Sequence, residues 1–306
     1  MGVSRMKFLT KKIRNFTVIT AALLALGLAC TAVASADSGG PQNNQSASPV
    51  LYSSLVSPYS SQSPPNEWWS LSFGGTNAVQ FGDKINLGSS SHLGSATVML
   101  DSQAVGTGTF QVPITFTFYQ PGTSGGSVGA VLATQTKTFN VPYRPAGDAT
   151  ACAAGTASIF TGFANDGTQW FDAATGSCYY GVVYPATFTF RDSKLPATVV
   201  YGVSYDATTG PASSLNVLLS TESASGAVTV GSDTDPGNLF VQAGSAANAL
   251  GGPNGQITCS PVGTSFQEYN TAVGTTGCGT DTQQGPGAPY EPIGFVPALE
   301  IDTNSK

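Results

Sequence analysis

Short runs in which apolar and polar residues alternate recur along most of this chain, and clusters of Gly, Ser, Pro, Asn and Asp separate them. The alternation is cleanest in Ile-Thr-Phe-Thr-Phe at 114–118 and in Thr-Phe-Thr-Phe at 187–190. A repeat of two puts successive side chains on opposite faces of a β-strand, so one face of each run should enter a core. No stretch carries the 3.6-residue apolar repeat of a convincing amphipathic helix, and an all-β fold is therefore predicted.

The number and spacing of these runs favour a two-sheet antiparallel sandwich, and a jelly roll is the arrangement that we expect. The clearest predicted strands are Val79–Leu87, Ser95–Leu100, Val112–Tyr119, Val131–Val141, Val182–Phe190, Thr198–Tyr205, Ser214–Leu219 and Phe295–Ile301.

Residues 1–36 have the order of a secretory signal peptide. A basic stretch that ends at Arg14 leads into the apolar run 16–29, and the small residues Ala34-Ser-Ala36 follow as a cleavage site. The apolar run is 14 residues long, whereas a membrane-spanning helix needs about 20, so no transmembrane segment is expected. We expect export and cleavage before Asp37. Cys30 leaves one alternative open, which is lipid attachment at the cell surface.

Residues 37–66 are rich in Ser, Pro, Gln and Asn and show no periodicity. Such a segment has too little apolar surface to offset the entropy of ordering its backbone, so it is predicted to be a disordered linker. Residues 67–306 are then the β-sandwich domain.

The balance of charges excludes nucleic acid as a partner. Removal of residues 1–36 takes away five basic and no acidic side chains, which leaves 6 basic and 17 acidic ones and a net charge of −11. The remaining basic residues are too few and too scattered to neutralise a run of phosphates.

Four cysteines remain after the signal peptide, an even number that suits an oxidising compartment. Short loops favour the pairs Cys152–Cys178 and Cys259–Cys278, although four cysteines allow three pairings. Zinc binding is disfavoured because neither pair has C-x-x-C spacing and His92 is the only histidine. The bridges would close two long loops, 144–180 and 243–289, which interrupt the strands and are the expected working surface.

The strand and turn phrases "VQFGDKINL", "SATVML", "VPITFTFYQPG", "TVVYGVSYD" and "VTVGSDTDPGNLFV" resemble a group of secreted actinobacterial proteins of unassigned function. Those proteins carry one predicted β-sandwich domain behind a signal peptide. The resemblance covers roughly residues 75–300 of the 306. It implies a fold and a compartment but carries no catalytic residues.

Motifs for catalysis are missing from the sequence. His92, in a turn-like Ser-Ser-Ser-His-Leu-Gly stretch, is the only histidine that could activate a nucleophile, and no G-x-S-x-G or H-E-x-x-H motif occurs. Glycoside hydrolysis needs two paired carboxylates, and nothing in the sequence pairs any two of them. A non-enzymatic protein is therefore expected, with a carboxylate-dependent glycosidase as the enzyme alternative.

Two polar clusters are candidate binding sites. Trp170 lies among polar residues of the first cysteine loop, where an exposed ring could stack on a sugar while its neighbours donate or accept hydrogen bonds. The alternative is that the ring packs into the fold. The residues of this candidate ligand site are Trp170, Asn165, Asp166, Gln169 and Asp172.

The second cluster, Asp233-Thr-Asp235-Pro-Gly-Asn238, places alternate oxygen ligands before a glycine, as Ca²⁺-binding loops do. The twelfth position is Gly244 rather than a bidentate glutamate, so a plain Asp-Pro-Gly turn is the alternative. No other cofactor is expected.

These observations favour a secreted binding module for carbohydrate or another envelope component. The alternative is a structural or adhesive exoprotein that self-associates, since low charge and Ser/Thr/Gly-rich strands also suit packing into a surface layer. The sequence does not define the oligomeric state.

Overall fold

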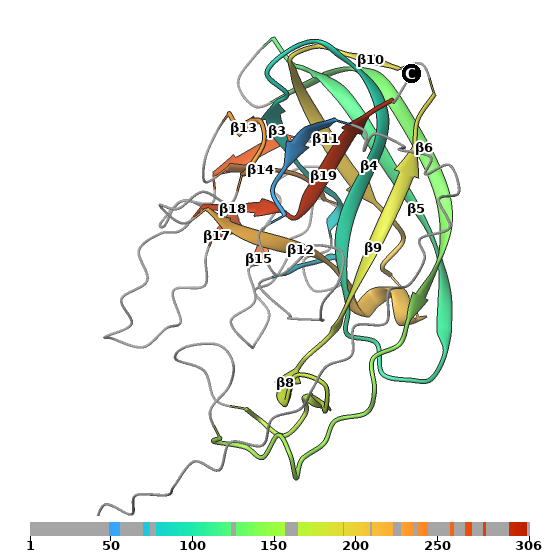
Figure 1. The fold of residues 1–306 in the computed structure, drawn as a ribbon, viewed down its shortest axis with the longest axis vertical. Coiled ribbons are helices and arrows are strands. Elements are labelled where there is room, and N and C mark those ends of the chain that lie inside the picture. Colours follow the sequence, from blue (N-terminus) through green and yellow to red (C-terminus); the bar gives the residue numbers. More distant parts are fainter. Residues whose placement is uncertain are drawn as a thin grey trace, which may run out of the picture. The chain divides into compact units, whose positions relative to one another are not determined.

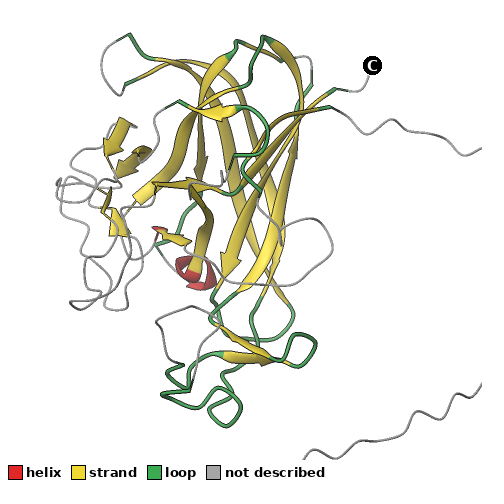
Figure 2. Ribbon diagram, turned by 60° about the vertical axis from the view of Figure 1, so that its left-hand side comes forward, coloured by secondary structure: helices red, strands yellow, loops and turns green. Residues whose placement is uncertain are grey.

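The computed structural model describes residues 49–55, 70–73, 78–123, 127–156, 165–191, 193–208, 210–222, 228–234, 238–243, 258–259, 267–270, 278–279 and 294–304. These residues form an all-β fold with two antiparallel sheets and one short 3₁₀ helix, η1 (Gly210–Ser214) (Figures 1 and 2). None of the helices in this part of the chain is long and apolar enough to cross a membrane.

The first sheet has eight strands, with β4 and β12 at its centre. β4 pairs with β9 and β10 and also with β19 and β12, while β12 pairs in addition with β2 and β18. The strands are β1 (Val50–Ser53), β2 (Ser70–Ser72), β4 (Ser91–Ser102), β9 (Val182–Thr189), β10 (Lys194–Leu195), β12 (Leu215–Glu222), β18 (Gly294–Pro297) and β19 (Leu299–Thr303).

The second sheet has seven strands in the order β16-β14-β3-β11-β5-β6, with β13 paired to β3. Its strands are β3 (Ala78–Asn86), β5 (Thr109–Pro121), β6 (Val128–Pro142), β11 (Thr198–Ser204), β13 (Ser232–Asp233), β14 (Asn238–Ala243) and β16 (Gln267–Asn270). Two further strand pairs lie in the cysteine loops: β7 (Trp170–Asp172) with β8 (Ser177–Tyr179), and β15 (Thr258–Cys259) with β17 (Cys278–Gly279).

Every strand predicted from alternation is present, with ends shifted by a few residues. The closing run, predicted as one strand, is two strands separated at Ala298. The prediction of an all-β, two-sheet fold is confirmed, and the jelly-roll arrangement stays a prediction.

The core is a layer of aromatic side chains between the sheets. Phe116 of β5 lies 5.4 Å from Phe188 of β9 and 5.7 Å from Tyr201 of β11, measured between ring centroids. Phe139 of β6 lies 5.1 Å from Phe188. These contacts join strands of both sheets, so the alternation at 114–118 and 187–190 places its apolar face where the sheets pack.

Side chains of β6 close one side of the sandwich. Among the described strands β9 pairs only with β4, which leaves its second edge open. Lys137 Nζ donates to the Thr187 carbonyl at 3.0 Å, and Gln135 Oε1 accepts from the Thr189 amide at 2.8 Å. The Lys137 ammonium also lies 4.9 Å from the centre of the Phe139 ring. Polar side chains turned inward thus satisfy edge groups of β9, a common way to protect a sheet edge.

The prediction that 37–66 is a disordered linker is wrong for the part of this segment that the structure describes. β1 pairs with β19, Tyr52 is fully buried, and the Ser54 amide donates to the Leu299 carbonyl at 2.9 Å. The sandwich therefore includes residues before 67. Partners more than 240 residues away hold this short strand in place. The polar residues around it in the sequence gave no indication of a strand.

Removal of β1 should destabilise the domain. A chain that begins at Ala47 keeps β1, whereas one that begins at Val56 loses the Tyr52 side chain and exposes the β19 edge. Because burial of one large apolar side chain contributes about 1.5–3 kcal/mol, we expect the shorter chain to lose at least about 3 kcal/mol of unfolding free energy, measured by urea denaturation. Equal midpoints for the two chains would contradict the assignment of β1 to the sandwich.

Candidate functional site

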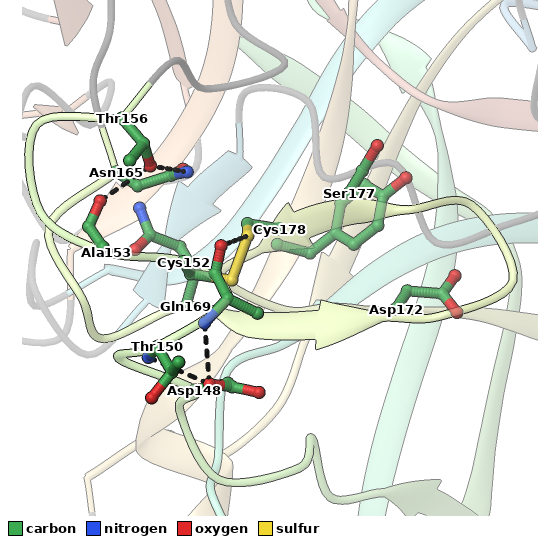
Figure 3. The surroundings of a disulfide bond; sticks show 12 residues. Asp148, Thr150, Cys152, Ala153, Thr156, Asn165, Gln169, Asp172, Ser177 and Cys178 are labelled. Atoms are coloured by element: carbon green, nitrogen blue, oxygen red, sulfur yellow. Dashed lines mark hydrogen bonds between the residues drawn. A yellow bond between two sulfur atoms is a disulfide. The ribbon is translucent and has the colours of Figure 1, made fainter.

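The first cysteine loop is closed by a disulfide between Cys152 and Cys178, as predicted (Figure 3). Asp148 organises the turn before Cys152: its Oδ1 accepts from the amides of Thr150 and Ala151 at 3.0 and 2.9 Å. Its carbonyl accepts from the Cys152 amide at 2.8 Å. The bridge ties this turn to β8, so the loop is fixed at both ends.

The expectation that Trp170 presents an exposed ring is wrong. The side chain is 9% exposed, and its Nε1 donates to the Gly181 carbonyl at 3.0 Å. Its ring packs 5.6 Å from that of Tyr179 on the paired strand. The indole therefore packs into the fold, the alternative that the sequence left open, and it is not available to stack on a sugar. Phe171 is the exposed aromatic residue of this hairpin.

The other four predicted ligand residues bond within the loop. Asn165 and Gln169 are buried, and each holds a turn: Asn165 Nδ2 donates to Thr156 Oγ1, and Gln169 Oε1 accepts from the Asp166 amide. Asp172 Oδ1 accepts from the Ala174 amide. The loop thus uses these polar groups to hold its own shape.

Asp166 is the most exposed of the five, but its carboxylate is also engaged. Oδ1 accepts from the amide and the hydroxyl of Thr168, and Oδ2 accepts from the Tyr180 hydroxyl at 3.0 Å. Desolvation raises the pKa of Asp166, but the hydrogen bonds together outweigh it and lower the pKa below its ordinary value. This pattern is typical of a structural carboxylate.

The second predicted disulfide is not among those found, and it stays a prediction. Cys259 and Cys278 face each other in the register of β15 and β17, and their side chains lie outside the described residues.

The predicted calcium turn is divided between two strands along β3. Asp233 ends β13 and Asn238 begins β14, and both of these strands pair antiparallel with β3. Asp235 lies outside the described residues. Within those residues, no group of three or more His, Cys, Asp or Glu side chains is gathered in a way that could hold a metal ion.

His92 is exposed on β4, opposite Lys194 of β10. Its neighbour across the strand pair is therefore a lysine rather than a hydroxyl or thiol nucleophile.

Asp101 is a carboxyl whose burial the sequence did not predict. It is fully buried on β4, opposite Asn216 of β12, and Gln103 Nε2 donates to its Oδ2 at 2.8 Å. Burial raises the pKa of Asp101 to about 6, against the opposing effects of hydrogen bonds from Gln103, Ser70 and Asn216 and of the Arg144 charge.

The return of the cysteine loop passes directly over this carboxyl. A Cβ at Gly181 would lie 1.7 Å from Asp101 Oδ1, so only glycine allows this approach. Because the Gly181 carbonyl also accepts the Trp170 indole N–H, the loop is docked on the sheet at this point. Asp101 is enclosed and is therefore a structural group that supports the loop.

The outward face of the second sheet differs in chemistry from the cysteine loop. Outward-facing positions of β5 and β6 carry hydroxyl, amide and proline side chains and no charged one. We call this surface the threonine face, and its residues are Gln111, Pro113, Thr115, Thr117, Thr134, Thr136, Thr138 and Asn140. Thr117 is the one buried member, and Thr115 is partly exposed.

The hydroxyls of the threonine face form cross-strand pairs. Thr115 Oγ1 lies 2.7 Å from Thr136 Oγ1, and Thr117 Oγ1 lies 2.9 Å from Thr134 Oγ1. Tyr119 continues the same face, and its hydroxyl accepts from Gln80 Nε2 at 2.9 Å. The period-two threonines of both strands were a visible signal in the sequence, but only the register shows that they meet.

No protein-family model matches this chain, and comparison with curated proteins and with solved structures finds no significant similarity. The resemblance to secreted actinobacterial proteins therefore stays a prediction.

The raised pKa of Asp101 predicts a pH-dependent stability. Its pKa is 3.8 without burial and about 6 in the fold, so the unfolded chain loses this proton at a lower pH than the native chain. The unfolding free energy should therefore fall as pH rises through 4 to 6, by about 2 kcal/mol between pH 4 and pH 7. Asp101→Asn should abolish this part of the slope in urea denaturation.

Asp206→Asn is the matched control. Hydrogen bonds from Thr208 lower the pKa of Asp206, so it stays ionised over this range and its variant should keep the wild-type slope. An Asp101→Asn protein with the wild-type slope would show that Asp101 does not titrate as expected.

Proposed function

We propose that this protein is a secreted, non-enzymatic module that binds uncharged polysaccharide, or a comparable neutral component of a cell envelope, through the threonine face. The observation that carries the proposal is the absence of charged side chains from the outward positions of β5 and β6 between 111–117 and 134–140. Sugar hydroxyls both donate and accept hydrogen bonds. Hydroxyl and amide side chains can also donate and accept, so they can pair with sugar hydroxyls in either direction.

The position of these side chains also supports binding. They lie on two long strands paired over 12 residue positions, and the aromatic layer packs beneath them. A rigid platform loses little conformational entropy when it binds an extended ligand. Tyr119 adds a partly exposed ring on the same face, held by Gln80, against which the apolar face of a sugar can pack.

Self-association through β6 is the second candidate. β6 pairs only with β5 among the described strands, and Val131 near its beginning is 56% exposed. An open edge with an exposed apolar residue can pair with a second copy of the chain.

Charge placed on the threonine face should weaken polysaccharide binding. In affinity electrophoresis through soluble glucan, mannan or xylan, the oxidised secreted chain should be retarded by at least one polysaccharide. Thr134→Glu with Thr136→Glu should weaken that binding by at least about tenfold, which corresponds to about 1.4 kcal/mol. Both sites are exposed, so the fold should survive.

Thr150→Glu is the matched control, because Thr150 is an exposed threonine in the cysteine loop. It should bind as the wild type does. Binding lost in Thr150→Glu and kept in the double variant would place the ligand on the loop. Concentration-dependent assembly in sedimentation velocity, with no retardation by any polysaccharide, would favour the structural alternative.

A further inference from the structure

Four side chains with acidic oxygens meet inside the sandwich where β1, β3, β11 and β13 come together. Asp83 of β3 lies directly opposite Tyr201 of β11, and Asp233 lies opposite Ile85, one step along the same face of β3. The groups that act electrostatically on the Tyr201 phenol are Asp83, Tyr52 and Asp233. We call these four residues the interior acid cluster.

The interior acid cluster is enclosed. Tyr52, Asp83 and Tyr201 are fully buried, and Oδ2 of Asp233 is shielded from solvent. The Tyr201 hydroxyl makes no hydrogen bond to any residue that the structure describes. A buried hydroxyl without a partner lowers the folding stability by about 1–3 kcal/mol. The position of this hydroxyl beside two carboxyls therefore needs an explanation.

The local electrostatics are those of an acidic site. Burial, Asp83, Tyr52 and Asp233 all raise the pKa of Tyr201 well above its ordinary value, and no basic group contributes. The phenol therefore stays protonated beside its acidic neighbours. Asp83 is fully buried and its Oδ1 accepts from the Lys84 amide at 2.7 Å, while Asp233 is partly buried. Both carboxyls act on the same phenol from one face of β3, so the potential at this point favours a cation.

The backbone holds Asp233 in this place from both sides. Gly231 has φ +76°, and a Cβ there would lie 3.0 Å from Tyr52 Cδ2, so the chain passes close to the tyrosine ring. On the other side, the Thr234 hydroxyl donates to the Lys84 carbonyl at 2.9 Å. The carboxyl is thus positioned between the sheets by contacts that do not involve its own charge.

We propose that the interior acid cluster binds one hard divalent cation, Ca²⁺, through the carboxylates of Asp83 and Asp233 and the phenol oxygens of Tyr201 and Tyr52. A proton shared between the carboxyls would leave the Tyr201 oxygen without a partner, whereas a cation held by the two carboxylates also engages that oxygen. Ca²⁺ takes six to eight oxygen ligands of mixed charge and tolerates irregular geometry, and water can complete the set. The site differs from the Asp233–Asn238 turn because Asp83 supplies its second carboxylate.

Terbium luminescence tests this site directly, because Tb³⁺ replaces Ca²⁺ and is sensitised by an adjacent tyrosine. The experiment uses the full secreted chain with its disulfides formed and first treated with EDTA. We expect tyrosine-sensitised emission that Ca²⁺ displaces, and a rise in Tm on adding Ca²⁺. Asp83→Asn should weaken Ca²⁺ binding by at least about a hundredfold and Tyr201→Phe by several-fold, as measured by calorimetry.

Asp235→Asn is the control that separates the two locations, because the turn requires Asp235 and the interior acid cluster does not. It should bind Ca²⁺ as the wild type does. The proposal is overturned if the wild type shows neither emission nor a Tm shift, or if Asp235→Asn abolishes binding while Asp83→Asn retains it. If Asp83→Asn fails to fold by circular dichroism, Tyr201→Phe decides: unchanged affinity and unchanged emission would refute the site.

Discussion

The packing of aromatic rings between the two sheets is the interaction on which the other features depend. Phe116 contacts Phe188 of the first sheet and Tyr201 of its own sheet, and Phe139 contacts Phe188 from the edge strand β6. Because these rings come from strands that are distant in the chain, they fix how the sheets face each other. The side chains of Gln135 and Lys137 then bond to the free edge of β9 and keep the two layers together.

The polar groups buried beside this core divide into two sets with different consequences. Asp101 lies on the outer side of the first sheet, where Gly181 and the disulfide-closed loop cover it. The interior acid cluster lies between the sheets, where Asp83 and Asp233 approach Tyr201. The first set anchors a loop whose own polar groups are already engaged, and the second has the composition of a cation site. Neither presents a surface to a large ligand, and we therefore propose the threonine face for that role.

The sequence predicted what period-two alternation controls and missed what distant partners control. The burial of Phe116 and Phe188 followed from the runs at 114–118 and 187–190. β1 escaped prediction because the segments that enclose Tyr52, β19 and the chain at Gly231, are distant in the sequence. The environment of Trp170 depends on the Gly181 carbonyl, and that of Asp101 depends on Asn216, so local composition indicated an exposed ring and gave no sign of a buried acid.

We propose that the sandwich is a rigid support and that the threonine face, rather than the cysteine loop, is its working surface. Threonine-methyl NMR during titration with a neutral oligosaccharide distinguishes these two surfaces. We expect shifts at Thr115, Thr134 and Thr136, with no change at the Thr97–Thr187 pair on the other sheet. Shifts confined to the loop threonines Thr150, Thr168 and Thr175 would contradict it.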